Sequence, residues 1–531
     1  MRRVILILAF IVSFNLAVIP CTSVVVTREA TVDGSVLNSY LCDGEFIPPF
    51  RVIPSADHRP GEMEVVKLWG GGEIRIPYPP HTYRVVGLMN EKQVSIGETT
   101  FGGRKELGRY KGGLSYPHLM RLALERASSA REAIRVMVDL ATKYGYSGPG
   151  ETFSVADKKE VWILEFVGRG AEEKGIVWVA RRVPPGHVSV HANQARIREI
   201  DFKDRENFMF SPDVVDFAVK KGYYDPASGK PFSFADVYDP ADAAKLRYCA
   251  RRVWRIFSRV APSLHLSPDY SSGLKGAKPY PFSVKPDRKL SVRDLISLLR
   301  DHYEGTPFYQ GNDITAGPFH NPYRWRPVTW KLEGKTYGWE RTISTQQTAF
   351  SFVSQARDYL PDPIGGVYWY SPDDTYTNCY VPFYDSALRI PERYTLGDIR
   401  KFSWKSAWWI FNLVANYAYG RYSDAVKDIR KVQKELEDKF FSLQPAVERA
   451  ALEIYKRSPG LAIEFLTEYS VVEGNAVLDR WIKLWEYLVA KYNDGYVKGK
   501  DGWPKAVGYP EDWLRRVVKE NPGKYLIEEE H

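Results

Sequence analysis

The sequence predicts an α+β fold in which helices cover antiparallel sheets. Over the first 200 residues, segments with strand patterns follow one another in pairs, with turn residues between them. Two helical segments separate the second pair from the third, and from about residue 403 to 492 the pattern is almost wholly helical. Consecutive paired strands favour hairpins, and strands grouped apart from helices favour layered α+β architectures.

The N-terminal third supplies most of the expected strands. The first two flank a turn at Asp33-Gly34, a pair typical of tight hairpins. Between the strand pairs, residues 118–127 and 128–145 have helical spacing, and the second helix starts at a serine cap and ends at a glycine. The expected strands are residues 22–28, 34–41, 84–90, 93–101, 152–158, 160–168, 176–183 and 187–193.

The rest of the chain divides into a loop-rich part and a helical part. Residues 200–345 are rich in Pro and Gly, with long loops and a few helices such as 291–303. Long loops in compact domains tend to be functional. Strand patterns return at 344–357 and 365–371, before the helical pattern begins. We find no internal repeat and no low-complexity tract.

Composition indicates a folded globular protein. Of the 531 residues, 44% are hydrophobic and 26% are charged, which excludes a disordered chain. The net charge is +9, but basic and acidic residues alternate, as in residues 430–440. Without a basic cluster or a recognisable reader motif, nucleic acid is not an expected partner.

The first twenty residues have the pattern of a secretory leader. Two arginines precede a continuous apolar run that ends at Pro20. The run is short for a membrane span and lies at the extreme N-terminus, so we expect residues 1–20 to be a signal or leader peptide. The mature protein is then secreted or extracytoplasmic, without stable membrane insertion, and soluble or loosely surface-held. Pro20 suits ordinary signal peptidase poorly. Either a second trimming step or self-cleavage then exposes Cys21, or the leader ends at another residue.

Several motifs carry little functional signal. The glycine run after Trp69 lacks the Lys-Ser/Thr ending of a phosphate loop. His187 and His191 lie in a strand pattern, where a spacing of four does not make a helical metal pair, and the four cysteines contain no CxxC. We therefore expect no metal and no cofactor. Asp301–Gly305 follows a helix as a surface turn, and no GxSxG elbow is present.

Cys21 is the strongest functional candidate. If the leader is removed before it, this residue carries a thiol and a free α-amine, whose ordinary pKa values are about 8.5 and about 7.7–8.0. The amine could then act as the general base for the thiol without a histidine partner. The alternatives are a buried cysteine at the start of a strand and a lipid anchor. Pro20 weakens the anchor, because a lipobox needs a small residue there.

Residues 21–46 resemble the opening of the secreted dipeptidases among the N-terminal-nucleophile (Ntn) cysteine hydrolases, relatives of penicillin V acylase, bile salt hydrolase and the secernins. The similarity continues nearly to the C-terminus. It implies a four-layer αββα sandwich in residues 21–400, with a helical extension at 401–531 packed on it. It also implies short peptide substrates and allows a homo-oligomer. The other similar segments are residues 87–104, 125–168, 191–197, 300–308 and 344–353.

The resemblance also implies roles for individual residues. Cys21 matches the nucleophile, and Asp43 matches the aspartate that hydrogen-bonds near it and orients the amine. Asn193 matches an asparagine beside the reacting carbonyl. Thr100 falls where the acylases carry an oxyanion asparagine, and Arg247 falls near their active-site arginine.

One position departs from the acylase pattern. The acylases have an arginine three residues before the aspartate, where this chain has Tyr40. A cation there would lower the thiol pKa, so its loss disfavours acylase activity and favours peptide hydrolysis. We therefore predict a cysteine dipeptidase that works through an acyl-enzyme. The alternatives are the same fold acting on non-peptide amides and an inactive scaffold used for binding.

Overall fold

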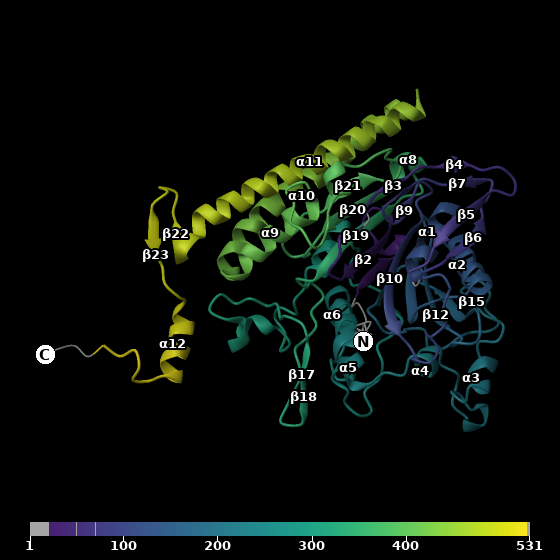
Figure 1. Cartoon of the computed structure of the whole chain (residues 1–531), viewed down its shortest axis with the longest axis horizontal. Coiled ribbons are helices and arrows are strands. Elements are labelled where there is room, and N and C mark those ends of the chain that lie inside the picture. Colours follow the sequence, from purple (N-terminus) through teal and green to yellow (C-terminus); the bar gives the residue numbers. More distant parts are fainter. Residues whose placement is uncertain (1–20, 49, 70, 528–531) are drawn as a thin grey trace, which may run out of the picture.

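Two antiparallel β-sheets form the centre of the fold in the computed structural model (Figure 1). The structure describes residues 21–48, 50–69 and 71–527. The predicted leader at 1–20 lies outside these residues. The α+β class with antiparallel sheets and a helical C-terminal part is confirmed.

The first sheet has seven strands, and its central strands come from opposite ends of the catalytic region predicted from the sequence. β2 pairs along its length with β19, which is more than 300 residues away, while its other edge pairs with β1. β1 and β2 are the predicted N-terminal hairpin. In order, the strands are β16 (Ser283–Val284), β14 (Val188–His191), β1 (Ser23–Val26), β2 (Val36–Asp43), β19 (Thr348–Ala356), β20 (Val367–Pro372) and β21 (Val381–Tyr384).

The second sheet has eight strands, and its central strands are buried on both faces. Every residue of β11 and β12 is buried, which explains their continuous apolar patterns. The strand order is β15 (Phe208–Phe210), β13 (Ile176–Arg182), β12 (Val161–Gly168), β11 (Gly150–Ala156), β10 (Ser95–Gly102), β9 (Met89–Asn90), β8 (Val85–Val86) and β3 (Val52–Ile53).

Helices α1 (Tyr116–Arg126) and α2 (Ala130–Tyr144) pack on the second sheet. The predicted serine cap is present, because Ser129 accepts a hydrogen bond from the backbone of Glu132. The helix ends at Gly145, whose φ of 87° suits a residue without a Cβ. Helices α6 (Arg251–Val260) and α7 (Val292–Leu299) pack instead against strands of the first sheet.

The two sheets face each other across a partly polar interface. β2 contacts both β10 and β11. The side-chain amide of Asn38 donates to the carbonyl oxygens of Ser95 and Ser154, at 3.2 and 3.3 Å. Buried polar groups of this kind are stable only when they are hydrogen-bonded, so they fix how the sheets stack.

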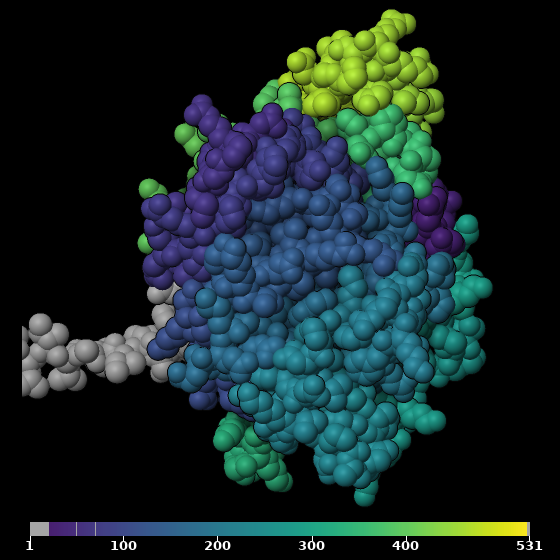
Figure 2. Space-filling model, turned by 90° about the vertical axis from the view of Figure 1, so that its right-hand side faces the viewer, coloured from purple at the N-terminus to yellow at the C-terminus, as the bar shows by residue number. Residues whose placement is uncertain are grey.

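The C-terminal helices extend along the edge of the first sheet. They are α9 (Ala407–Tyr419), α10 (Tyr422–Tyr455) and α11 (Pro459–Tyr492), and the last two have 34 residues each. α11 packs on α10, α9 and β21, and Figure 2 shows it as a yellow-green ridge above the rest of the surface. The Trp369 ring of β20 stacks on Phe441 of α10, with centroids 4.3 Å apart. The sequence predicted shorter helical pieces here, and α10 continues through Pro445.

Residues 200–345 contain several short helices between their loops, as the sequence predicted.

In the residues that the structure describes, no helix combines the length and the apolar character needed to cross a bilayer. The remaining elements are β4 (Ala56–Asp57), β5 (Met63–Lys67), β6 (Glu73–Pro77), β7 (His81–Thr82), α3 (Asp216–Lys220), α4 (Phe234–Tyr238), α5 (Ala243–Lys245), a π-helix (Leu246–Ala250), β17 (Thr329–Leu332), β18 (Lys335–Gly338), α8 (Asp362–Gly365), β22 (Tyr496–Lys498), β23 (Pro504–Ala506), α12 (Glu511–Glu520) and short 3₁₀ helices between them.

Replacing Trp369 with Ala should lower the free energy of unfolding by about 3–5 kcal/mol, because it empties a fully buried site between β20 and α10. Chemical denaturation followed by intrinsic fluorescence and circular dichroism measures the loss. Trp503→Ala is the matched control, since Trp503 is 74% exposed. Equal denaturation midpoints for the two variants would contradict the packing assigned to this contact.

Candidate active site

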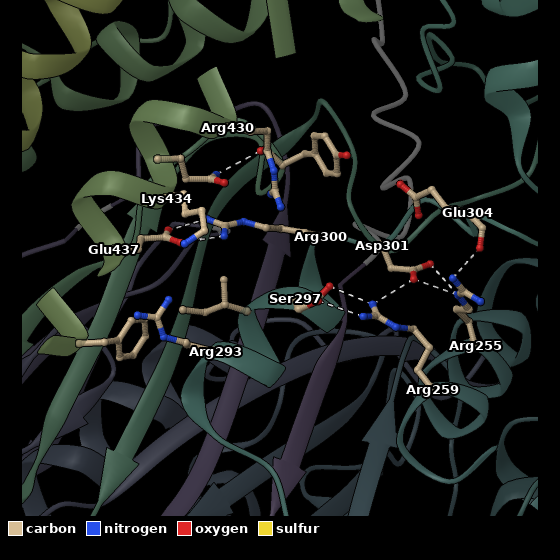
Figure 3. Close-up of a pocket in the computed structure, with 14 residues that line it drawn as sticks. Arg255, Arg259, Arg293, Ser297, Arg300, Asp301, Glu304, Arg430, Lys434 and Glu437 are labelled. Carbon is tan, nitrogen blue, oxygen red and sulfur yellow. Dashed lines mark hydrogen bonds and ion pairs between the residues drawn. The ribbon is translucent and has the colours of Figure 1, made fainter. Parts of the chain in front are cut away.

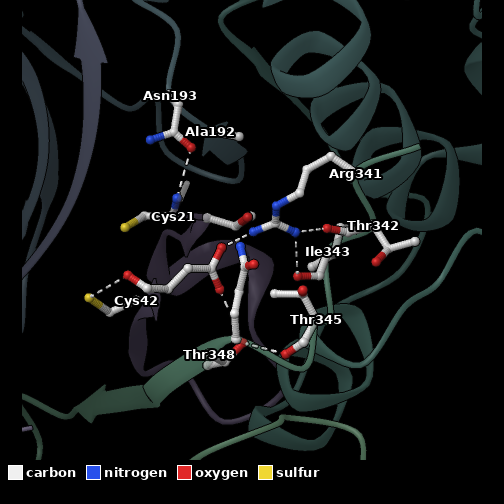
Figure 4. Close-up of polar contacts among 12 residues, drawn as sticks. Cys21, Cys42, Ala192, Asn193, Arg341, Thr342, Ile343, Thr345 and Thr348 are labelled. Atoms are coloured by element: carbon white, nitrogen blue, oxygen red, sulfur yellow. Dashed lines mark hydrogen bonds and ion pairs between the residues drawn. The ribbon is translucent and has the colours of Figure 1, made fainter. Parts of the chain in front are cut away.

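Cys21 lies directly before β1, at the meeting point of the two sheets. The bridge between Thr22 and Leu41 places Cys21 opposite Cys42 on the neighbouring strand. Only 1% of the surface of Cys21 is exposed. Its backbone nitrogen donates to the Asn193 side chain (Figure 4). Its sulfur lies 3.7 Å from the Tyr40 hydroxyl. The thiol and the nitrogen of one residue are thus held separately by two side chains.

Asn193 connects Cys21 to both sheets. It follows β14 with a φ of 58°, a left-handed conformation that asparagine tolerates better than most residues. Its Oδ1 accepts from the nitrogen of Cys21 at 2.8 Å and from Nη2 of Arg252 at 2.9 Å. Its Nδ2 donates to the carbonyl oxygen of Thr100, on β10 of the other sheet, at 2.7 Å. These bonds fix the orientation of the amide.

Arg252, which the sequence analysis did not select, is the α6 arginine that contacts Cys21. It is fully buried, and its Nη1 donates to the carbonyl oxygen of Cys21 at 2.5 Å and to the Thr22 hydroxyl at 2.8 Å. Arg247 extends elsewhere, pairing with Glu340 at 2.7 Å with its side chain 41% exposed. Both arginines lie in the segment 246–252, so the sequence located the segment, and the helical phase decided which arginine points inward.

Asp43 forms a buried ion pair with a second residue that the sequence did not indicate. Arg341 donates to Oδ2 of Asp43, and the Thr348 hydroxyl donates to Oδ1 at 3.1 Å. Burial lowers the pKa of Arg341 to about 10, and negative charge on Cys21 would raise it, so this guanidinium interacts electrostatically with the nucleophile position. Figure 4 shows Arg341 reaching towards the Cys21 side of the site.

Two guanidinium groups therefore stand near Cys21, although position 40 holds tyrosine. Arg252 comes from α6 and Arg341 from the loop before β19. Cations near a thiol favour its ionised form. Position 40 has no arginine, but α6 and the loop before β19 supply positive charge to the site.

Tyr40 joins Cys21 to a pair of buried glutamates. Its hydroxyl donates to Oε2 of Glu98 at 2.8 Å, and the Thr100 hydroxyl donates to Oε1 of the same carboxyl at 2.9 Å. Glu151, on the neighbouring strand β11, interacts electrostatically with Glu98 and accepts from the Tyr146 hydroxyl at 2.8 Å. Burial raises the pKa of both carboxyls, and the charge of Glu98 raises that of Glu151 further. We expect two such carboxyls to hold one proton between them, because two adjacent buried negative charges repel each other.

This chain of hydrogen bonds sets the resting state of the thiol. The Tyr40 hydroxyl lies between the two groups, 3.7 Å from the Cys21 sulfur and 2.8 Å from Oε2 of Glu98. Burial raises the pKa of the Cys21 thiol well above its usual value, with further increases from Cys42 and Glu98, while the hydrogen bond with Tyr40 lowers it. The thiol is therefore neutral at rest and needs a nearby base to ionise.

Glu98 was detectable in the sequence as an acidic residue within the predicted strand 93–101, and Glu151 directly precedes the predicted strand 152–158. The strands that carry them, β10 and β11, were predicted, and both residues are fully buried in them. Arg341 gave no comparable signal, because it lies in an irregular loop.

The two histidines examined for metal binding have other partners. Nδ1 of His187 bonds with the Ser283 hydroxyl at 3.0 Å, and Nδ1 of His191 bonds with the Thr99 hydroxyl at 2.7 Å. Burial lowers the pKa of His191 to about 3, so its ring is neutral at physiological pH. Within the described ranges of the chain, no group of three or more His, Cys, Asp or Glu side chains is arranged to hold a metal ion.

Comparison with known proteins finds one family and several similar relatives. Residues 79–435 match the model of peptidase family C69. A probable dipeptidase of Latilactobacillus sakei is 29% identical over 439 residues, covering 78% of this chain and 85% of the relative. A probable dipeptidase of Salmonella dublin is 31% identical over 388 residues, covering 69% and 81%. Dipeptidase A of Lactobacillus helveticus is 24% identical over 451 residues, covering 79% and 84%.

Replacing Glu151 with Gln should flatten the pH dependence of stability. The native state keeps the shared proton above the unfolded-state pKa of about 4.3, so wild-type stability is full below that pH. It falls as the pH rises through the raised folded-state pKa, by up to about 1.4 kcal/mol per pH unit for one proton. The amide in the variant needs no proton, so its stability relative to wild type should increase with pH.

Denaturation curves between pH 4.5 and 8 test this expectation. Glu464→Gln, on an exposed position of α11, controls for loss of one negative charge. Parallel stability curves for wild type and Glu151→Gln would show that the carboxyls do not share a proton.

Proposed function

Because the chain belongs to peptidase family C69, we propose that it is a cysteine-type dipeptidase whose nucleophile is Cys21. The observation that carries the proposal is the placement of both the nitrogen and the sulfur of Cys21 within hydrogen-bonding distance of fixed side chains, Asn193 and Tyr40. The relatives named as dipeptidases favour short peptides over non-peptide amides as substrates.

The proposed mechanism begins with removal of residues 1–20, which turns the Cys21 nitrogen into an α-amine. With a pKa of about 7.7–8.0, the amine is well matched to accept the thiol proton. The thiolate then attacks the peptide carbonyl, and the protonated amine gives its proton to the departing amino group. Water, activated by the same amine, hydrolyses the resulting thioester and restores the thiol.

Asn193 and the two arginines have distinct roles in this mechanism. Oδ1 of Asn193 already accepts from the Cys21 nitrogen, so it would orient the amine lone pair towards the thiol. Arg252 and the Arg341–Asp43 pair would stabilise the thiolate against the cost of burial. Arg252 holds the carbonyl of Cys21 and thereby fixes the backbone of the nucleophile.

We further propose that residues 21–400 form a four-layer αββα catalytic sandwich of the Ntn type, with 401–531 as a helical extension packed on it. Support comes from the two facing sheets and from the helices that pack on each of them. The N-terminal pattern supports a mature protein outside the cytoplasm, soluble or loosely surface-held, which starts at Cys21.

Cys21→Ala should lower kcat/KM for dipeptides by at least about 10³-fold while the protein stays folded, because it removes the thiol that the proposed mechanism uses as nucleophile. The test compares purified mature proteins whose N-terminal mass has been measured. Cys379→Ala, which removes a buried thiol of the core, is the control and should keep its activity. Full activity in Cys21→Ala, or in a molecule that begins upstream of Cys21, would refute the mechanism.

Tyr40→Phe should shift the ionisation of the Cys21 thiol to higher pH, because the lost hydroxyl hydrogen bond lowers the thiol pKa in the wild type. The pH dependence of alkylation by iodoacetamide measures that ionisation in the mature enzyme, and the acid limb of kcat/KM should move in the same direction. Tyr370→Phe, a buried tyrosine of β20, is the matched control. Identical alkylation profiles would remove Tyr40 from the proposed mechanism.

A further inference from the structure

A cavity lies where α10 meets α6 and α7 (Figure 3). Its lining includes none of the residues described around Cys21. Its volume is about 530 Å³. The lining contains six basic side chains, three carboxylates and two aromatic rings. The basic side chains come from α6, α7 and α10, and from Arg300, which directly follows α7. The basic residues are Arg255, Arg259, Arg293, Arg300, Arg430 and Lys434.

Four of these six cations form ion pairs with only two carboxylates. Arg255 and Arg259 both bond to Asp301, at 2.9 and 3.0 Å. Arg293 and Lys434 both bond to Asp438, which stands beside the cavity. Two carboxylates thus serve four cations, which leaves excess positive charge at this place.

The remaining acidic side chains do not remove the excess. Glu437 is engaged by Arg300, at 2.6 Å, in a buried ion pair. Glu304 bonds to His302, at 3.1 Å, on the side of the cavity away from α10. The net charge of the lining is therefore positive.

Arg430 is the cation for which a counter-ion is missing. In the described part of the chain it forms no ion pair, and its buried Nη1 has no hydrogen-bond partner. The guanidinium stands over the Tyr376 ring at 4.8 Å. Burial and the nearby charge of Arg300 lower the pKa of Arg430, which shows that its charge is destabilised where it stands. An anion in the cavity would stabilise a partly buried cation in this position.

We propose that this cavity binds a small anion carrying two or more phosphate groups, held by Arg430 and the neighbouring arginines. The guanidinium fork matches phosphate oxygens in geometry, and several arginines around one space favour a multivalent anion. The cavity exceeds the size of a single phosphate, and Tyr376 and Phe441 supply apolar surface in its lining for an attached organic group.

Binding there would clamp the C-terminal helices onto the catalytic region, because the lining comes from α10 on one side and from α6 and α7 on the other. A ligand that binds only the assembled cavity stabilises the folded chain. The same α6 carries Arg252, but the proposal concerns binding and does not depend on the peptidase function.

Thermal unfolding of the full chain tests the site, with pyrophosphate, tripolyphosphate and ATP as probes. Each titration is run against sodium chloride at the same ionic strength. Wild type should show a saturable rise in Tm with at least one probe. Tighter binding of ATP than of tripolyphosphate would assign the organic part to the aromatic side of the cavity, and equal binding would assign the site to inorganic polyphosphate.

Arg430→Gln should weaken the binding by at least about tenfold, the effect of losing a charge-assisted contact. Without ligand, its Tm should equal or exceed that of wild type, because an unpaired cation has been removed. Lys434→Gln, whose side chain is 75% exposed and cannot disturb the core, should also weaken binding. Arg449→Gln, an exposed position of the same helix, is the matched control and should bind as wild type does.

Two results would overturn the proposal. One is a Tm that responds to the phosphates no more than to chloride. The other is an equal response in wild type, Arg430→Gln and Lys434→Gln, which would indicate a general ion effect on a basic protein.

Discussion

The site depends on the hydrogen bond between the Cys21 nitrogen and Oδ1 of Asn193. That amide also accepts from Arg252 and donates to the carbonyl of Thr100, so one side chain joins β14, α6 and β10 at the start of β1. The position of the nucleophile is thus set by both sheets together. In the proposed mechanism, the same contact orients the atom that accepts the thiol proton.

Burial raises the pKa of the Cys21 thiol, and nearby positive charges favour its ionised form. A thiol with 1% exposure ionises reluctantly, and the neighbouring Glu98 adds to the difficulty. The guanidinium groups of Arg252 and Arg341 and the hydroxyl of Tyr40 act in the opposite direction. A neutral thiol at rest next to a matched amine needs no permanent thiolate, which protects the sulfur from side reactions until substrate is bound.

The C-terminal helices pack on the sheet that carries the site. α10 rests on the first sheet through stacking of Trp369 on Phe441 and through the buried Arg300–Glu437 pair. The sheet that α10 covers also carries Cys21, so the packing of α10 supports the same sheet that positions the nucleophile. The basic cavity between α10 and α6 lies on this connection.

The sequence by itself determined the order of strands and helices and singled out Cys21, because alternation, caps and turn residues are local signals. Its resemblance to a known family pointed to Asn193, Asp43 and the segment that holds Arg247 and Arg252. Only the tertiary structure decided that Arg252 and not Arg247 contacts the nucleophile, that Arg341 pairs with Asp43, and that burial raises the pKa of both Glu98 and Glu151. These choices depend on helical phase and on contacts between residues up to about 300 positions apart, which no local pattern encodes.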